Sequence, residues 1–216
     1  MSPPGNNLPF QLTSLIGREK EILEVGRLLA EKTRLLTLTA PGGAGKTRLA
    51  LAVAANMVGG FDDGVWLIEL APLSDQDLVP QAIASVLGVR ETPGTALVDS
   101  LCVHLVARDI LLILDNCEHL IEDCADLAGA LLRSCPKLRI LATSREALGM
   151  PGEALFAVPP LSLPDPRRLP TVEILPSYEA AGLFVERARA VRPGFALTES
   201  NAMRWHKCIT ASTAYP

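Results

Sequence analysis

Residues 35–47 read LLTLTAPGGAGKT, and this stretch decides the fold of the chain. The short apolar, partly β-branched run 35–39 predicts a buried strand, and Pro41 with the glycines after it predicts a turn. From Thr47 the sequence changes to an apolar, helix-forming run, which a pair of glycines ends soon after Met57. A glycine-rich loop between a strand and a helix is the local structure that cradles phosphate groups.

This loop offers a nucleotide three kinds of group. Its glycines let successive N–H groups curl toward phosphate oxygens, and the start of the helix adds the positive end of its dipole. Lys46 supplies a point charge for the β- and γ-phosphates, and the Thr47 hydroxyl supplies a ligand for Mg²⁺. We therefore predict that the nucleotide contacts Pro41, Gly42, Gly43, Ala44, Gly45, Lys46, Thr47 and Arg48.

Position 40 departs from the usual form of such a loop, which begins with glycine. The Cβ of Ala40 would cost about 1 kcal/mol if the backbone there needs a positive φ, although the amides that contact phosphate lie downstream. The competing interpretation is a glycine-rich turn that contains Gly-Lys-Thr by accident. The strand and the helix on either side favour the phosphate loop.

A second motif, ILLILDN at residues 110–116, places a carboxylate at the end of a predicted strand. Asp115 could hold Mg²⁺ through its water shell, or it could only cap the following helix. The next residue is Asn116, where P-loop ATPases that hydrolyse quickly carry a glutamate. An amide orients water but cannot accept its proton, so we expect hydrolysis to be slow at most. Glu118 and His119 could substitute as bases, although Glu118 would also suit the first turn of a helix.

A third motif follows the strand predicted at 138–143, where Ser144 leads into Arg145. The C-terminal ends of parallel strands line the ligand crevice, so Arg145 could reach the γ-phosphate and report which nucleotide is bound. A single arginine at a strand end could also be merely solvated. We take as candidate catalytic residues Asp115, Asn116, Glu118 and Arg145, and as metal-binding residues Thr47 and Asp115.

Strands and helices alternate along the rest of the chain. Further strands are predicted at 65–70 and 154–158, and helices at 19–29 and at about 75–87, 96–106, 120–132 and 178–190, with another helix beginning at Thr198. This pattern predicts an α/β fold of three layers with a parallel five-stranded sheet. We expect an irregular segment at 1–14, a nucleotide-binding domain at 15–163, a proline-rich linker at 164–176 and part of a helical lid domain at 177–216.

The composition narrows the classes of partner. The 216 residues are 49% hydrophobic and 20% charged with a net charge of −4, which is typical of a globular chain. No basic block exceeds Arg167-Arg168, so we expect no direct nucleic-acid contact from this segment. The apolar run 110–114 is far shorter than the roughly 20 residues that span a membrane. Five cysteines with no C-x-x-C pair and no secretory signal favour the cytoplasm.

Four ordered motifs resemble those of a known family. They are LIGRE at 15–19, PGGAGKTRLA at 41–50, LLILDNCEHL at 111–120 and ILATSREAL at 140–148. Together they look like the STAND class of signal-transduction ATPases, which is related to the NB-ARC and AAA+ groups. The likeness is greatest to the ATPase modules of bacterial LuxR- and SARP-type transcription regulators.

The resemblance implies a P-loop NTPase that works as a switch. Such a switch holds ADP when inactive, exchanges it for ATP with Mg²⁺, and then assembles or opens to expose an effector, so self-association or further effector domains are expected. By position, Gly17, Arg18 and Glu19 match the segment that flanks the adenine, and Arg145 matches the first sensor. His119 falls in the family's Asp-Asn-x-x-His string, where it has no assigned role.

The C-terminal residues depart from the pattern of this family. The family continues into a Gly-Leu-Pro segment, a winged helix and effector domains, whereas residues 203–216 follow a different course. We therefore expect a truncated or frame-shifted copy with an incomplete lid. Its apolar face at Phe184 and Val185 would then lack a partner.

Other classes of protein compete with this interpretation. A P-loop small-molecule kinase or another metabolic ATPase could use the lid arginines Arg187, Arg189 and Arg192, which would also suit the solvated side of a helix. The guanine-reading Asn-Lys-x-Asp of a GTPase and the Ser-Gly-Gly-Gln of a transporter ATPase do not occur. A zinc module would need Cys117, His119, Cys124 and Cys135, whose spacing suits buried thiols better.

Overall fold

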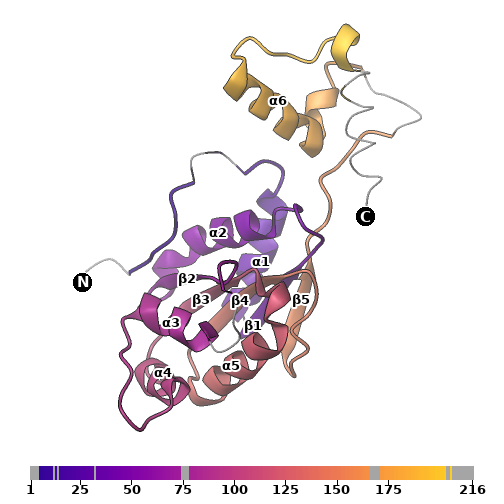
Figure 1. The fold of residues 1–216 in the computed structure, drawn as a ribbon. Helices are drawn as coiled ribbons and strands as arrows, with labels where there is room; N and C mark the ends of the chain where they lie inside the picture. The colour runs from indigo at the N-terminus through magenta and orange to yellow at the C-terminus, as the bar shows by residue number, and fades with distance from the viewer. Residues whose placement is uncertain are drawn as a thin grey trace. The chain divides into compact units, whose positions relative to one another are not determined.

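The computed structural model describes residues 5–73, 78–165, 171–202 and 205, except Leu12, Ser14 and Lys32 (Figure 1). The described residues form two compact units. The first unit contains those within Met1–Thr13 and Lys20–Val158, and the second contains those within Ser14–Glu19 and from Pro159 onward. No helix in the described part of the chain is long and apolar enough to cross a membrane.

A five-stranded parallel sheet forms the centre of the first unit. Its strands are β1 (Leu35–Thr39), β2 (Val65–Glu69), β3 (Leu111–Asp115), β4 (Arg139–Ser144) and β5 (Glu153–Ala157). They lie in the order β2-β3-β4-β1-β5, and every neighbouring pair is parallel. The predicted α/β fold with a five-stranded parallel sheet is therefore confirmed.

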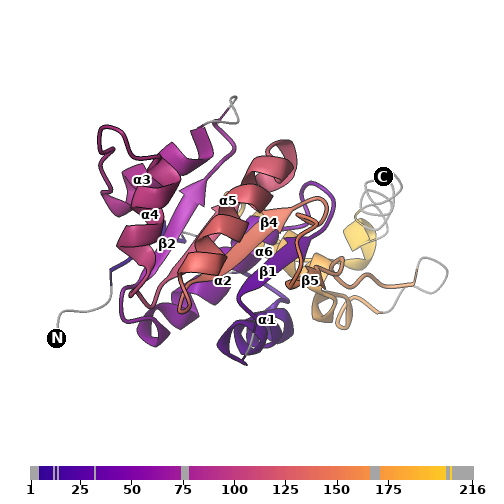
Figure 2. The ribbon, with the colours of Figure 1, turned by 90° about the horizontal axis from the view of Figure 1, so that it is seen from below.

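Helices cover both faces of this sheet (Figures 1 and 2). One face packs against α1 (Glu19–Glu31) and α2 (Lys46–Met57), and the other against α3 (Val79–Leu87), α4 (Leu97–Leu105) and α5 (Ile121–Ser134). Strand β3 shows why both faces are apolar. Its Leu111 and Ile113 lie in one core, and its Leu112 and Leu114 lie in the other.

The observed limits of β2, β3, β4 and β5 each differ from the predicted ones by one residue. The strand predicted at 110–114 is observed at Leu111–Asp115, and the Asp115 carbonyl accepts a hydrogen bond of 3.0 Å from the Leu70 N–H. The site carboxylate is thus held by the sheet itself. The predicted helix at about 75–87 is observed from Val79, and residues 74–77 lie outside the described part.

The N-terminal segment contains no regular element over residues 5–11, yet it follows the outer side of β2. The Gly5 carbonyl accepts a hydrogen bond of 3.1 Å from the Val65 N–H, and Asn6 bridges to Val65 in parallel. The Asn7 side chain accepts from the Leu67 N–H at 2.6 Å and donates to the Leu67 carbonyl at 2.8 Å. These contacts satisfy backbone groups that an edge strand otherwise leaves open.

The second unit has its own small core around α6 (Glu179–Val191), which follows a short 3₁₀ turn at Leu175–Ser177. The core residues are Leu175, Ala181, Val185, Leu197, Ala202 and Trp205. A hydrogen bond of 2.8 Å from the Ala202 N–H to the Thr198 carbonyl confirms the helix start predicted at Thr198.

The expectation that Phe184 and Val185 lack a partner is wrong. Val185 is buried in the second unit, and Phe184 makes an edge-to-face contact with Phe195 at 5.7 Å between ring centroids. The segment after α6 supplies these partners, which a comparison of motifs does not reveal. The predicted aberrant tail at 203–216 lies outside the described residues apart from Trp205.

Candidate functional site

The phosphate loop connects β1 to α2. Its Gly43 and Gly45 have φ angles of 80° and 88°, in the left-handed region that favours glycine. Among the described residues other than glycine only Asn116 has a positive φ, so the methyl group of Ala40 causes no backbone strain. Gly45 caps α2 without a side chain, which leaves the first N–H groups of the helix for a ligand.

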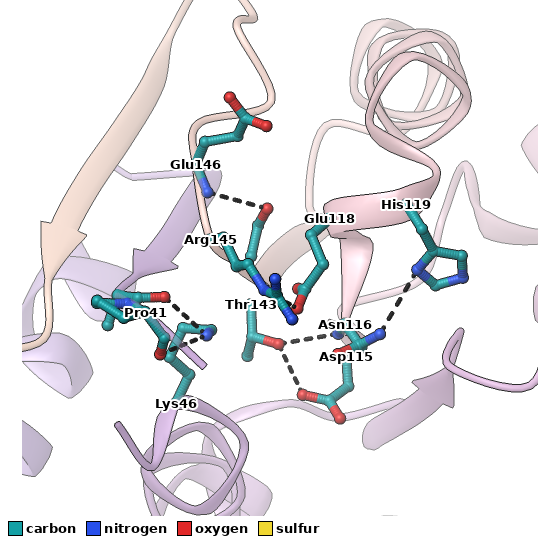
Figure 3. Close-up of polar contacts among 11 residues, drawn as sticks. Pro41, Lys46, Asp115, Asn116, Glu118, His119, Thr143, Arg145 and Glu146 are labelled. Carbon is teal, nitrogen blue, oxygen red and sulfur yellow. Dashed lines mark hydrogen bonds and ion pairs between the residues drawn. The ribbon is translucent and has the colours of Figure 1, made fainter. Parts of the chain in front are cut away.

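Lys46 holds this loop closed through its ammonium group. Its Nζ donates to the Ala40 carbonyl at 2.9 Å and to the Pro41 carbonyl at 3.3 Å (Figure 3). The side chain is buried, and an ammonium has three donors, so two hold the loop and a third is left for an anion. The loop is therefore shaped for phosphate before any phosphate binds.

Asp115 is the point at which three elements meet. Its Oδ1 accepts a hydrogen bond of 2.7 Å from the Thr47 hydroxyl on α2 and another of 2.7 Å from the Thr143 hydroxyl on β4. Thr143 also accepts a hydrogen bond of 2.9 Å from the Asn116 N–H. Since Thr143 is only 1% exposed, these contacts fix the direction of the carboxylate.

The oxygens of Thr47 and Asp115 fit a magnesium ion. A hydroxyl that donates to a carboxylate keeps its own lone pairs for a cation, and Mg²⁺ prefers oxygen ligands, with a few protein groups completed by phosphate and water. Among the described residues no group of three or more His, Cys, Asp and Glu side chains could hold a metal ion. The zinc module considered from the sequence is therefore wrong: Cys117 and Cys124 are buried thiols instead.

Asn116 occupies an unusual backbone position beside this carboxylate. Its φ of 70° and ψ of 54° lie in the left-handed region, which asparagine tolerates better than most residues. Its Nδ2 lies 3.5 Å from Nδ1 of His119, whose Nε2 lies 3.1 Å from the carbonyls of Leu70 and of Leu73. Figure 3 shows His119 on the far side of Asn116 from Lys46.

Arg145 and Glu118 form an ion pair next to the loop. Arg145 Nε donates to Glu118 Oε1 at 3.0 Å, with the arginine side chain 65% exposed and the glutamate 16% exposed. A Cβ placed on Gly42 would lie 3.7 Å from Arg145 Nη2, so the guanidinium is beside the phosphate loop. One oxygen of Glu118 is thus engaged by a cation.

The remaining predicted site residues contact other segments or belong to the second unit. Arg48 donates to the Thr13 carbonyl at 2.7 Å and to its hydroxyl at 3.0 Å, in the N-terminal segment. Gly17, Arg18 and Glu19 belong to the second unit, where Gly17 has a φ of 69° and adjoins the Glu179 side chain. The first unit therefore brings together the phosphate loop with Asp115, Asn116, Glu118 and Arg145.

Thr143 is a site residue that sequence reasoning missed. Its signal was present in the string Thr-Ser-Arg, which ends β4 and supplies Arg145. Its importance depends on β4 lying next to β3, which brings its hydroxyl to Asp115 across 28 residues of sequence.

This chain is similar to several known proteins. The model of the AAA domain family matches residues 29–150. An uncharacterized protein of Mycobacterium tuberculosis (strain ATCC 25618 / H37Rv) is 43% identical over 192 residues, which cover 89% of this chain and 45% of that protein. A candidate HTH-type transcriptional regulator of the same strain is 41% identical over 176 residues, which cover 82% of this chain and 18% of the regulator.

One solved structure extends the similarity across both units. It is a signal transduction ATPase with numerous domains (STAND) from Pyrococcus horikoshii that has a tetratricopeptide repeat sensor. The similarity has a TM-score of 0.56 at 14% identity and covers 93% of this chain and 28% of that one. At this identity it shows the fold alone. The chain spans less than half of the length of the curated relatives that it matches.

Proposed function

Because the chain belongs to the AAA domain family and carries a P-loop, we propose that it binds ATP or ADP with Mg²⁺. In this proposal the chain acts as a regulatory switch with slow or no hydrolysis. The observation that carries the proposal is the site around Asp115. The Thr47 hydroxyl lies 2.7 Å from this carboxylate, while the adjacent residue is an amide, Asn116. We infer that these groups hold the nucleotide and that the amide of Asn116 cannot serve as a base for hydrolysis.

Each site residue has a role in this proposal. The loop from Pro41 to Arg48 binds phosphates, with the third donor of Lys46 directed to an anion. Thr47 and Asp115 would hold Mg²⁺, which neutralises charge on the β- and γ-phosphates when bound. We propose Gly17, Arg18 and Glu19 for the adenine side of the nucleotide.

Arg145 is the proposed sensor of the γ-phosphate. Its guanidinium is beside Gly42 and mostly exposed, so a change of partner needs little desolvation. The ion pair with Glu118 gives it a partner in the absence of nucleotide. A γ-phosphate carries more negative charge than one carboxylate and can compete for the guanidinium.

The biological setting is part of the same proposal. A relative at 41% identity is a candidate HTH-type transcriptional regulator, so we propose that this ATPase module serves transcription regulation in the cytoplasm. We also propose that the chain belongs to the STAND class, with NB-ARC and SARP-type relatives. Self-association and an effector elsewhere in the protein are further parts of this proposal. A metabolic ATPase or small-molecule kinase would differ by faster turnover.

Titration calorimetry with ADP and with ATP, each with Mg²⁺, tests the proposal. Binding of both nucleotides is expected for the unchanged chain, and Lys46→Ala should abolish it, because the loop loses its buried cation. Lys137→Ala is the matched control, since Lys137 is an exposed lysine next to β4. Equal affinity of the Lys46 variant would contradict nucleotide binding by this loop. Turnover above about 1 per second would contradict the switch and favour a metabolic enzyme.

A further inference from the structure

We propose that His119 is a positioning residue that holds the side-chain amide of Asn116 in one orientation. His119 ends the short 3₁₀ turn Cys117–His119, which joins β3 to α5. The proposed function gives this residue no role. Its ring lies between Asn116 and the residues that follow β2. Figure 3 shows the contact of the ring with Asn116.

The contacts of His119 decide which ring nitrogen carries the proton. Nε2 lies 3.1 Å from both the Leu70 carbonyl and the Leu73 carbonyl. A carbonyl oxygen only accepts hydrogen bonds, so Nε2 must be the donor. In a neutral imidazole Nδ1 is then an acceptor.

The acceptor at Nδ1 decides the orientation of the amide. Asn116 Nδ2 lies 3.5 Å from it, which is at the long end of the hydrogen-bond range. Such a contact adds little stability, but the reversed amide would place Oδ1 against Nδ1, and two acceptors repel. The ring therefore selects the amide rotamer in which Oδ1 faces away from His119.

The backbone of Asn116 is fixed as well. Its N–H donates to the Thr143 hydroxyl at 2.9 Å, and its left-handed conformation is the only one among described residues other than glycine. Residues held in sparsely populated backbone regions cluster at functional sites. The backbone and the side-chain amide of Asn116 are thus both constrained, and Oδ1 is left as an acceptor on the residue that follows Asp115 in sequence.

The consequence rests on the proposed function. If the site binds ATP, Oδ1 can accept a hydrogen bond from the attacking water and orient it, although it cannot remove the proton. His119 would then act on turnover only through Asn116. Because its ring also binds Leu70 and Leu73, it links the carboxyl ends of β2 and β3 in a single contact.

His119→Gln separates this role from a structural one. A glutamine amide can still donate to the two carbonyls, but it places no acceptor where Nδ1 lies. A thermal midpoint close to that of the unchanged chain is expected for His119→Gln, and a lower midpoint for His119→Ala. Residual ATP turnover should fall by about tenfold in both, because the water loses its oriented acceptor. Wild-type turnover in His119→Gln would overturn the proposal.

A double-mutant cycle with Asn116→Ala shows whether His119 acts through Asn116. The variant that combines His119→Gln with Asn116→Ala should hydrolyse ATP no more slowly than Asn116→Ala alone. Effects that multiply would overturn the proposal. His104 is another histidine that the structure places in a helix, α4. His104→Ala is the control and should change neither the thermal midpoint nor ATP turnover.

Long-range ¹H–¹⁵N correlation spectra test the geometry without nucleotide. The His119 ring should carry its proton on Nε2, and the Asn116 side-chain amide signals should move in His119→Gln. A proton on Nδ1, or an unmoved Asn116 amide, would overturn the proposal. If calorimetry finds no nucleotide binding but the tautomer is as expected, the proposed function fails while the positioning contact stands.

Discussion

The Thr143 hydroxyl donates a hydrogen bond of 2.7 Å to Oδ1 of Asp115. The same oxygen accepts from the Thr47 hydroxyl, so a single carboxylate oxygen connects β3 with β4 and with α2. Thr143 is satisfied in both directions, because it accepts from the Asn116 N–H. The carboxylate is therefore oriented by the fold before a nucleotide or metal ion arrives.

Thr143→Val keeps the shape of the side chain but removes this connection. The Asn116 N–H loses its partner, so the free energy of unfolding should fall by about 1–3 kcal/mol. Nucleotide affinity in the presence of Mg²⁺ should fall as well, because Asp115 is no longer held. Chemical denaturation and calorimetry measure the two effects.

Thr37→Val is the matched control for that change. Thr37 is fully buried on β1, and its Oγ1 has no hydrogen-bond partner in the described structure. Replacing the hydroxyl by a methyl group should leave stability unchanged or raise it. An equal loss of stability in both variants would show that the Thr143 hydrogen bonds contribute nothing specific.

Glu118→Gln should shift the preference of the site toward ATP. The substitution removes the charge that holds Arg145, so the guanidinium becomes available to a γ-phosphate. A partly exposed ion pair contributes up to about 1 kcal/mol, which corresponds to about a fivefold tighter ATP affinity with ADP affinity unchanged. Calorimetry with both nucleotides measures the ratio.

Glu31→Gln controls for the loss of a surface charge, because it breaks the exposed ion pair with Arg27 on α1. This variant should bind both nucleotides like the unchanged chain. Weaker ATP binding by Glu118→Gln would show that Glu118 supports the γ-phosphate instead of competing with it.

Asn116→Gly and Asn116→Ala should differ in stability but share a functional defect. At a φ of 70°, alanine is strained relative to glycine, so the alanine variant should unfold about 1 kcal/mol more easily. Both variants lose the amide, so residual ATP turnover should fall by a similar factor in both. Denaturant titration gives the first comparison and a phosphate-release assay the second. Equal stability would mean that the left-handed backbone relaxes at no cost.

Gly17→Ala should destabilise the second unit. A Cβ at this position would meet the side chain of Glu179, and the φ of 69° disfavours it further. Glu179 Oε2 accepts from the Ser162 N–H at 2.8 Å, so its displacement would also break that contact. Hydrogen exchange should become faster along α6. Gly194→Ala, where a Cβ meets nothing within 4 Å, should leave exchange unchanged.

The sheet was predictable from the sequence, but its strand order was not. Alternating apolar runs and helices identify parallel strands, whereas the order β2-β3-β4-β1-β5 depends on packing between distant segments. The motifs located Lys46, Thr47 and Asp115 because each lies in a short, local string of residues. They did not reveal how Thr143 or His119 contribute, since those contacts depend on which strands and turns are neighbours in the folded sheet.

The N-terminal segment has a consequence for how the chain behaves at high concentration. β2 is an edge of the sheet, and the backbone of Gly5 with the side chain of Asn7 occupies its outer hydrogen-bonding groups. Gly64 permits this approach, because a Cβ there would collide with the Gly5 carbonyl. A strand from another molecule would find Val65 and Leu67 already hydrogen-bonded on this side. These few residues therefore make the β2 edge a poorer partner for edge-to-edge aggregation.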